Sequence, residues 1–218
     1  MRHFFGIEDE EFIRGDVPMT KREIRMAVLN EARVQEDSYV LDVGAGTGSI
    51  SIEAALGAPK GHVYAIERFE KGIELIKANA EKFGVNNLTV IEAKAPEGMA
   101  DLPALDAIVI GGSAGGMDAI LDESERLLKP GGRLVVTAVT METGYTILKA
   151  LKGRPFTYEG YQMQINRFRK AGPYHLLNPL SPIFIVTAIK QADVLRFELS
   201  SQNYKDFELS PKLYRCWI

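Results

Sequence analysis

Apolar side chains recur at helical spacing early in the chain. Ile24, Val28, Leu29 and Ala32 fall on one stripe of a helix. The four residues before this stripe, Thr-Lys-Arg-Glu at 20–23, have the form of a capping box. The pattern therefore predicts a helix that begins at Thr20.

From residue 39 to residue 152, short apolar runs alternate with amphipathic stretches. Continuous apolar runs such as 107–110 and 134–136 are typical of parallel strands that are buried on both faces. The predicted strands are 39–43, 62–67, 88–92, 106–111 and 132–139, and the predicted helices are 48–57, 70–83, a short one near 97–101, 116–128 and 142–152. Such alternation, with right-handed crossovers, predicts a doubly wound sheet with helices on both sides.

The apolar period changes to two after residue 155. Alternating positions run from Phe156 through Phe168, and another apolar run covers 182–190. Two late strands without a helix between them predict an antiparallel hairpin at the sheet edge. The glycine and prolines of 169–181 predict a loop between the two strands.

The expected fold class is α/β, a doubly wound seven-stranded mostly parallel sheet with an antiparallel C-terminal hairpin. Residues 1–190 are expected to form one domain. Residues 191–218 lie outside the repeating pattern and form a C-terminal extension of unknown role, whose aromatic residues around Trp217 are a candidate contact surface.

Composition narrows the class of partner. The 218 residues include 26 basic and 29 acidic side chains, and there is no dense Lys/Arg run that would neutralise a nucleic-acid backbone, so a nucleic-acid substrate is disfavoured. We expect a cytoplasmic protein, because neither a secretory signal nor a membrane-spanning run is present. With Cys216 as the single cysteine and three scattered histidines, neither an internal disulfide nor a metal site is expected.

A glycine-rich turn follows the first predicted strand. Gly44, Gly46 and Gly48 are spaced as G-x-G-x-G and preceded by Asp42, whereas dinucleotide sites use G-x-G-x-x-G to bring a helix N-terminus to a pyrophosphate. Glu67 ends the second predicted strand, where a carboxylate can accept both hydroxyls of a ribose. S-adenosyl-L-methionine has no phosphate but carries an ammonium, a sulfonium and a ribose diol, so two acids suit it. The alternatives are a simple tight turn, and for Asp42 a side chain that only caps the loop.

Five further motifs carry a family resemblance. They are Val-Pro-Met-Thr-Lys at 17–21, Ala-Lys-Ala-Pro-Glu at 93–97, Ile-Val-Ile-Gly-Gly-Ser at 108–113, Leu-Lys-Pro-Gly-Gly-Arg at 128–133 and Val-Thr-Ala-Val at 136–139. Together with the strand order, they make residues 15–190 similar to the decarboxylating precorrin methyltransferases of cobalamin biosynthesis, which have the Rossmann-like class I methyltransferase fold. The resemblance implies methylation of carbon 15 of a corrin precursor and loss of carbon dioxide from the carbon-12 acetate, in the stand-alone form without a carbon-5 methyltransferase.

The resemblance also implies residue roles and an assembly. The residues expected to contact S-adenosyl-L-methionine are Thr20, Gly44, Ala45, Gly46, Thr47, Gly48, Glu67 and Ala95, besides Asp42. Thr20 has an equally good alternative as the helix cap. A homotetramer is expected from the resemblance alone.

The acceptor side has weaker signals. Gly111, Gly112 and Ser113 stand where many amine methyltransferases carry an Asn- or Asp-Pro-Pro-aromatic motif, so they either open space for a flat tetrapyrrole and bind its carboxylates or form a tight turn. The candidate carboxylate-binding cations are Lys21, Arg22, Arg167, Arg169 and Lys170, each with a solvated surface position as the alternative. Tyr161, Asn166 and His175 are weaker candidates for proton transfer, and no catalytic base is assigned.

Two other functions stay open at this stage. One is an RNA or protein methyltransferase on the same scaffold, and the other is a non-catalytic module that binds S-adenosyl-L-methionine.

Overall fold

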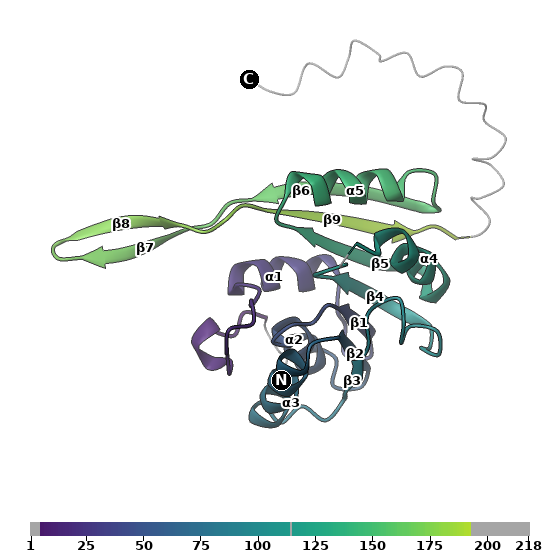
Figure 1. Ribbon diagram of the computed structural model, residues 1–218, viewed down its shortest axis with the longest axis horizontal. Helices are drawn as coiled ribbons and strands as arrows, with labels where there is room; N and C mark the ends of the chain where they lie inside the picture. Colours follow the sequence, from purple (N-terminus) through teal and green to yellow (C-terminus); the bar gives the residue numbers. More distant parts are fainter. Residues whose placement is uncertain (1–4, 114, 193–218) are drawn as a thin grey trace, which may run out of the picture.

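The computed structural model describes residues 5–113 and 115–192, in which seven strands form one sheet with the order β3-β2-β1-β4-β5-β9-β6 (Figure 1). Its strands are β1 (Tyr39–Val43), β2 (His62–Glu67), β3 (Leu88–Glu92), β4 (Leu105–Ile110), β5 (Leu128–Ala138), β6 (Phe156–Met163) and β9 (Ile183–Lys190). The helices are η1 (Asp9–Glu11), α1 (Arg22–Glu31), α2 (Ser49–Gly57), α3 (Glu70–Lys82), α4 (Met117–Leu127) and α5 (Met141–Leu151). Strands β1 to β5 pair in parallel, and β9 runs antiparallel to both β5 and β6. The predicted fold class is therefore confirmed.

Two hydrophobic cores lie on opposite faces of the sheet. Consecutive residues of a strand point to opposite faces, so in β4 Ile108 and Ile110 enter one core while Ala107 and Val109 enter the other. The first core includes α4 and α5, and the second includes α1 and α2. This double burial explains why the central strands read as continuous apolar runs.

Two local predictions were wrong. The first helix begins at Arg22, not Thr20, and its N-cap is Lys21, which makes no side-chain cap hydrogen bond. The carboxylate of Asp9 instead accepts a hydrogen bond from the Arg22 amide (2.9 Å). Residues 97–101 form turns and not a short helix, because Gly98 adopts a φ of +81°, outside the helical region.

The strand β5 begins earlier than the predicted 132–139. It starts at Leu128, and its pairing with β4 shifts register between Leu105 and Ala107, which accommodates the Pro-Gly-Gly segment at 130–132. Gly131 has a φ of +78° within this irregularity. The bulged stretch therefore belongs to the strand and not to a connecting turn.

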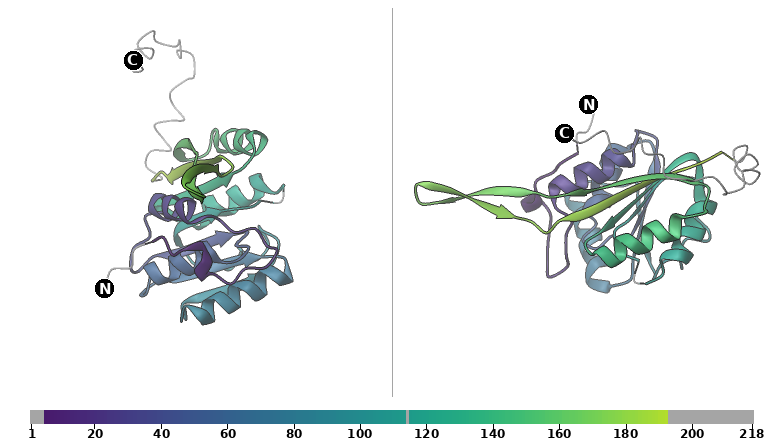
Figure 2. Two further views of the ribbon diagram at one scale, coloured as in Figure 1. Left: turned by 90° about the vertical axis from the view of Figure 1, so that its left-hand side faces the viewer. Right: turned by 90° about the horizontal axis from the view of Figure 1, so that it is seen from above.

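The predicted loop 169–181 was also wrong. Strand β6 ends at Met163, and the following residues form an antiparallel hairpin of β7 (Asn166–Ala171) and β8 (Tyr174–Pro179). Gly172 and Pro173 make its turn, with a φ of +61° at the glycine. The hairpin extends well beyond the body of the protein (Figure 2). Its strands are mostly exposed, so no buried face produced the alternating pattern that identifies a strand.

Two findings concern segments rather than contacts. The described part of the chain holds no helix with the length and apolarity needed to cross a bilayer. The expected role of the aromatic C-terminal extension falls on residues 193–218, which are outside the described residues.

Candidate functional site

A cavity of about 1150 Å³ opens at the carboxyl ends of the central strands. Strand β1 lies between β2 and β4, where the strand order reverses, and this is the position at which open α/β sheets bind ligands. Residues 16–21, the loops after β2, β3 and β4, and the base of the β7–β8 hairpin complete its walls. Since pockets for one small molecule usually measure roughly 300–1,000 Å³, the cavity can hold a nucleoside together with part of a second ligand.

The glycine-rich turn after β1 forms the floor of the cavity. Gly44 has a φ of +74°, and a Cβ there would lie 2.9 Å from the Gly112 carbonyl oxygen. The amides of Gly44 and Ala45 donate to the Ile66 carbonyl (2.9 and 3.1 Å), which ties the turn to the end of β2. A side chain at Gly44 would thus separate the two loops that meet under the ligand space.

Glu67 is held at the end of β2 by backbone amides. Its Oε1 accepts from Arg68 and Phe69 (2.8 and 2.9 Å), and its Oε2 accepts from Gly46 (2.9 Å). A Cβ on Gly72 would lie 2.8 Å from the Glu67 Cγ, so the glycine leaves room for this arrangement. Glu67 is only 6% exposed and lines the cavity, and its carboxylate oxygens can also accept from ligand hydroxyls.

Asp42 is the second acid on the cavity wall. It is 1% exposed, and its Oδ2 accepts a hydrogen bond from the Ser51 hydroxyl (2.6 Å). Burial raises the pKa of Asp42 to about 6, the Ser51 hydrogen bond opposes this rise, and the charge of Glu67 adds to it. No cation of the described residues is among the groups that shift the pKa of Asp42, so its charge is available for a ligand that brings its own positive charge.

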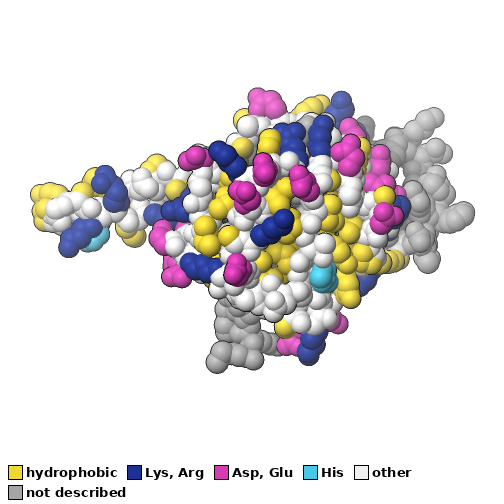
Figure 3. Space-filling model, turned by 60° about the horizontal axis from the view of Figure 1, so that its bottom comes forward, with side chains coloured by type: hydrophobic (Ala, Val, Ile, Leu, Met, Phe, Trp, Pro, Cys, Tyr) yellow, Lys and Arg dark blue, Asp and Glu magenta, His cyan; other side chains and the backbone are white. Residues whose placement is uncertain are grey.

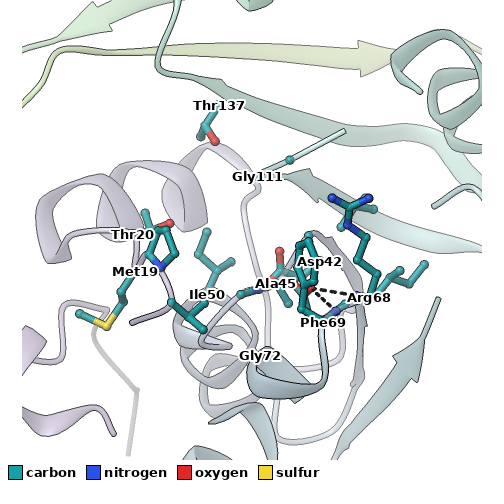
Figure 4. Close-up of a pocket in the computed structure, with 18 of the residues that line it drawn as sticks. Met19, Thr20, Asp42, Ala45, Ile50, Arg68, Phe69, Gly72, Gly111 and Thr137 are labelled. Atoms are coloured by element: carbon teal, nitrogen blue, oxygen red, sulfur yellow. Dashed lines mark hydrogen bonds between the residues drawn. The ribbon is translucent and has the colours of Figure 1, made fainter. Parts of the chain in front are cut away.

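The segment 16–21 forms the wall opposite the loop after β2. Figure 4 shows Met19 and Thr20 on one side of the cavity and Arg68 and Phe69 on the other. The Thr20 carbonyl accepts a hydrogen bond from the buried guanidinium of Arg25 (2.6 Å). Thr20 thus lines the cavity and does not cap α1.

Gly111, Gly112 and Ser113 line the cavity above the glycine-rich turn. A Cβ on Gly112 would meet nothing within 4 Å, so protein packing does not require glycine at this position. The base of the hairpin adds Ile165, Leu180 and Ile183 to this side of the cavity.

Most residues predicted for the donor line the cavity. Those that line it are Thr20, Asp42, Gly44, Ala45, Gly46, Glu67 and Ala95. Thr47 and Gly48 are the buried part of the turn and do not line the cavity. Thr47 is 1% exposed, its Oγ1 has no hydrogen-bond partner in the described structure, and a Cβ on Gly48 would lie 2.9 Å from the Ile76 side chain.

Of the cations predicted to bind the acceptor, only Lys21 lines the cavity in the described structure. Lys21 lines the cavity, whereas Arg22 pairs with Glu8 and Arg167 pairs with Glu23 and Asp9. The hairpin residues Asn166, Arg169, Lys170 and His175 are exposed and do not line the cavity. Tyr161 is also outside it, and its hydroxyl lies 3.3 Å from Glu31.

Some cavity residues were missed from the sequence. Phe69, two residues after Glu67, is 60% exposed, and the Arg68 guanidinium lies 4.3 Å from its ring centroid. Its position directly after the acidic strand end is the signal that could have indicated a stacking platform for a purine. Arg68, Lys71 and Lys94 add positive charge to the same end of the cavity.

Known proteins are similar to this chain in sequence and in architecture. Residues 11–190 match the family described as "Precorrin methyltransferase domain". A "Probable cobalt-precorrin-6B C(15)-methyltransferase (decarboxylating)" from Sulfurisphaera tokodaii is 40% identical over 83% of this chain and 95% of the relative. The "Cobalt-precorrin-6B C(15)-methyltransferase (decarboxylating)" of Salmonella typhimurium is 35% identical over 87% of this chain and 99% of the relative. A crystal structure of a precorrin-6y C5,15-methyltransferase from Geobacter metallireducens superposes with a TM-score of 0.82 at 36% identity, covering 86% of this chain and all of that one.

Proposed function

This chain belongs to the precorrin methyltransferase domain family, and on that premise we propose that it methylates carbon 15 of a cobalt-precorrin and decarboxylates the same molecule at its carbon-12 acetate. The observation that carries the proposal is a cavity of about 1150 Å³ lined by two buried acids and by an open Gly-Gly turn that lies beside the glycine-rich turn. The part of the cavity at the acids, the donor end, suits a cationic nucleoside, and the part at the Gly-Gly turn, the acceptor end, leaves room for a flat acceptor next to it.

The donor end fits S-adenosyl-L-methionine, which supplies an electrophilic methyl group on a sulfonium. Glu67 accepts the ribose hydroxyls, and Asp42 provides a negative charge for the cationic part of the ligand. Gly44 and Gly46 let the backbone approach the ligand closely, and Ala45, Thr20 and Ala95 complete the contacts. Thr47 and Gly48 are the buried residues of the turn and act only through its packing, and Phe69 offers its ring to the adenine.

The acceptor end holds a polycarboxylate macrocycle. The side-chain ammonium of Lys21 lines this wall and has no hydrogen bond or ion pair within the described residues, so it is available for an acetate or propionate group. The Gly111–Gly112 backbone and Ser113 bound the space in which the ring lies. The apolar wall made by Ile165, Leu180 and Ile183 excludes water and restricts the pose, and positioning of this kind supplies much of the catalysis in a methyl transfer.

The proposed reaction requires little proton transfer by protein side chains. An electron-rich ring carbon is itself the nucleophile, and the protonated conjugated ring can take up the electron pair that remains when the acetate loses carbon dioxide. Shape and charge therefore carry the reaction, which agrees with a cavity that contains carboxylates, three lysines, an arginine and backbone amides.

Turnover tests the proposal directly. The protein is incubated with S-adenosyl-L-methionine and a late cobalt-precorrin, and the product is weighed by mass spectrometry, with Glu67→Gln as the matched variant. We expect gain of one methyl group, loss of one carbon dioxide and a much slower variant. Methylation of RNA or protein in parallel reactions, with no change in the precorrin, would refute the proposal.

We also propose that the protein assembles into a homotetramer through the β7–β8 hairpin. Two-stranded hairpins are marginally stable alone in water, yet this one exposes Phe168 (78%), Tyr174 (71%) and Leu177 (64%). Figure 3 shows hydrophobic and basic side chains side by side on the projecting arm. Light scattering is expected to give the mass of four chains for the wild type and a smaller mass for a Phe168→Glu/Leu177→Glu variant; a monomeric wild type would contradict this.

The cytoplasmic location also stays a prediction, testable by cell fractionation.

A further inference from the structure

A network of buried charges lies behind the acceptor wall. Arg25 is fully buried and donates from Nε to Glu53 (2.8 Å) and from Nη1 to Asp9 (2.7 Å) and to the Thr20 carbonyl (2.6 Å). The Glu53 carboxylate also accepts from the amides of Gly6 and Ile7. Both ends of the N-terminal segment 5–21 are thereby fixed to the first two helices, including the part that lines the cavity.

The hairpin joins this network through Arg167. The guanidinium of Arg167 forms a bidentate ion pair with Glu23, in which Nε donates to Oε1 (2.9 Å) and Nη2 donates to Oε2 (2.6 Å). Nη2 also donates to Asp9 Oδ2 (3.2 Å). These hydrogen bonds lower the pKa of Glu23. Burial alone would raise the pKa of Asp9, but its hydrogen bonds with Arg25 and Arg167 hold it below its ordinary value. Both partners of Arg167 are therefore ionised at neutral pH.

Asp9 therefore connects three parts of the protein: the N-terminal segment, α1 and the hairpin. It belongs to the N-terminal segment, it accepts from the α1 residues Arg22 and Arg25, and it accepts from Arg167 at the start of the hairpin. Ile165, two residues before Arg167, lines the cavity, and Leu180 and Ile183 line it where the hairpin returns. The separation between the segment 16–21 and the hairpin base thus depends on the Arg167 pair.

We propose that Arg167 is a positioning residue that latches the hairpin base to α1 and the N-terminal segment, and in this way sets the shape of the acceptor compartment. Its guanidinium is directed at Glu23 and Asp9, not at the acceptor, so it acts through the wall that it holds. The inference rests on the proposed function for its kinetic test but not for its structural one.

Two variants separate a latch from a direct acceptor ligand. Arg167→Gln and Glu23→Gln each remove one half of the pair, and Arg169→Gln is the matched control, since Arg169 lies on the same exposed strand and has no ion pair with the described residues. We expect both latch variants to raise the KM for the cobalt-precorrin by roughly tenfold to a hundredfold. The dissociation constant for S-adenosyl-L-methionine should change much less than the KM, because Thr20 is on segment 16–21 while Asp42, Glu67 and the glycine-rich turn are not. Arg167→Lys should recover part of the loss because it keeps the charge without the fork.

The opposite pattern identifies a ligand. If Arg167 bound an acceptor carboxylate, Glu23→Gln would free it, and the KM would fall or stay constant while Arg167→Gln raised it. That result, or a KM that neither variant changes, would overturn the inference.

A second readout does not depend on turnover. Amide hydrogen exchange in segments 16–21 and 180–183 should become faster in both latch variants and stay as in the wild type in Arg169→Gln, in proteins of equal oligomeric mass. Unchanged exchange refutes the latch. Faster exchange in a protein that leaves precorrin unmodified refutes the proposed function and keeps the latch.

Discussion

Replacing Asp42 by Asn is expected to stabilise the ligand-free protein at neutral pH. The Asn side chain has nearly the same shape and keeps an oxygen that can accept the Ser51 hydrogen bond. Burial raises the pKa of Asp42 from 3.8 to about 6. Because each difference of one between folded and unfolded pKa values corresponds to about 1.4 kcal/mol, ionised Asp42 lowers the free energy of unfolding by about 3 kcal/mol.

The pH dependence has a definite sign. Between pH 3.8 and about 6 the unfolded chain gives up the Asp42 proton while the folded chain keeps it, so this group makes stability fall as the pH rises. The Asp42→Asn variant lacks this pH-dependent contribution to the free energy of unfolding. Its advantage over the wild type should grow from about 1 kcal/mol at pH 4.5 to about 3 kcal/mol at pH 7.5, and then level off.

Urea unfolding at a series of pH values measures this difference. Glu92→Gln, which removes an exposed acid at the end of the edge strand β3, is the control for loss of one negative charge. Added S-adenosyl-L-methionine should reverse the order, because a cationic ligand stabilises ionised Asp42 and binds the wild type more tightly above pH 6. A variant that is less stable than the wild type at pH 7.5, or equally responsive to the ligand, would refute the reasoning.

Three further variants test the cavity. Gly44→Ala should cost more than about 2 kcal/mol in urea unfolding, because a φ of +74° disfavours a side chain and its Cβ would lie 2.9 Å from the Gly112 oxygen; a cost within error would contradict this. Gly112→Ala should change stability by less than about 0.5 kcal/mol but raise the acceptor KM, because its Cβ has open space within the protein, and unchanged kinetics would count against an acceptor there. Glu67→Gln places an amide group among three N–H donors, so calorimetry should show affinity for S-adenosyl-L-methionine reduced about tenfold or more; undiminished binding would exclude Glu67 as the ribose ligand.

The parts of the fold that are buried on both faces were predictable. The bounds of β1 and β2 coincide with the predicted strands because their apolar runs are packed between two helical layers. The bounds of β3, an edge strand with half-buried and exposed residues, also coincide with its short apolar run. The exposed hairpin has no buried face, so its strands were read as a loop. The start of α1 was misplaced because Asp9, thirteen residues before Arg22, replaces the local cap, and only the folded N-terminal segment brings it there.

In the candidate site too, the local features were predictable from the sequence and the long-range contacts were not. Asp42, the glycine-rich turn and Glu67 are close in sequence to the strand ends that carry them, so their position at the cavity could be predicted. The pairing of Arg167 with Glu23 joins residues 144 positions apart, and no local pattern reports it. A basic residue near a predicted sheet edge therefore cannot be distinguished, from sequence, from one whose charge is already used within the protein.

A crystal structure with S-adenosylhomocysteine, the demethylated donor, tests the central claim most directly. We predict the nucleoside in the cavity between Glu67 and the segment 16–21, with its ribose hydroxyls on the Glu67 carboxylate and its amino acid part toward the glycine-rich turn and Asp42. A nucleoside bound elsewhere, or one whose hydroxyls face another acid, would contradict the account.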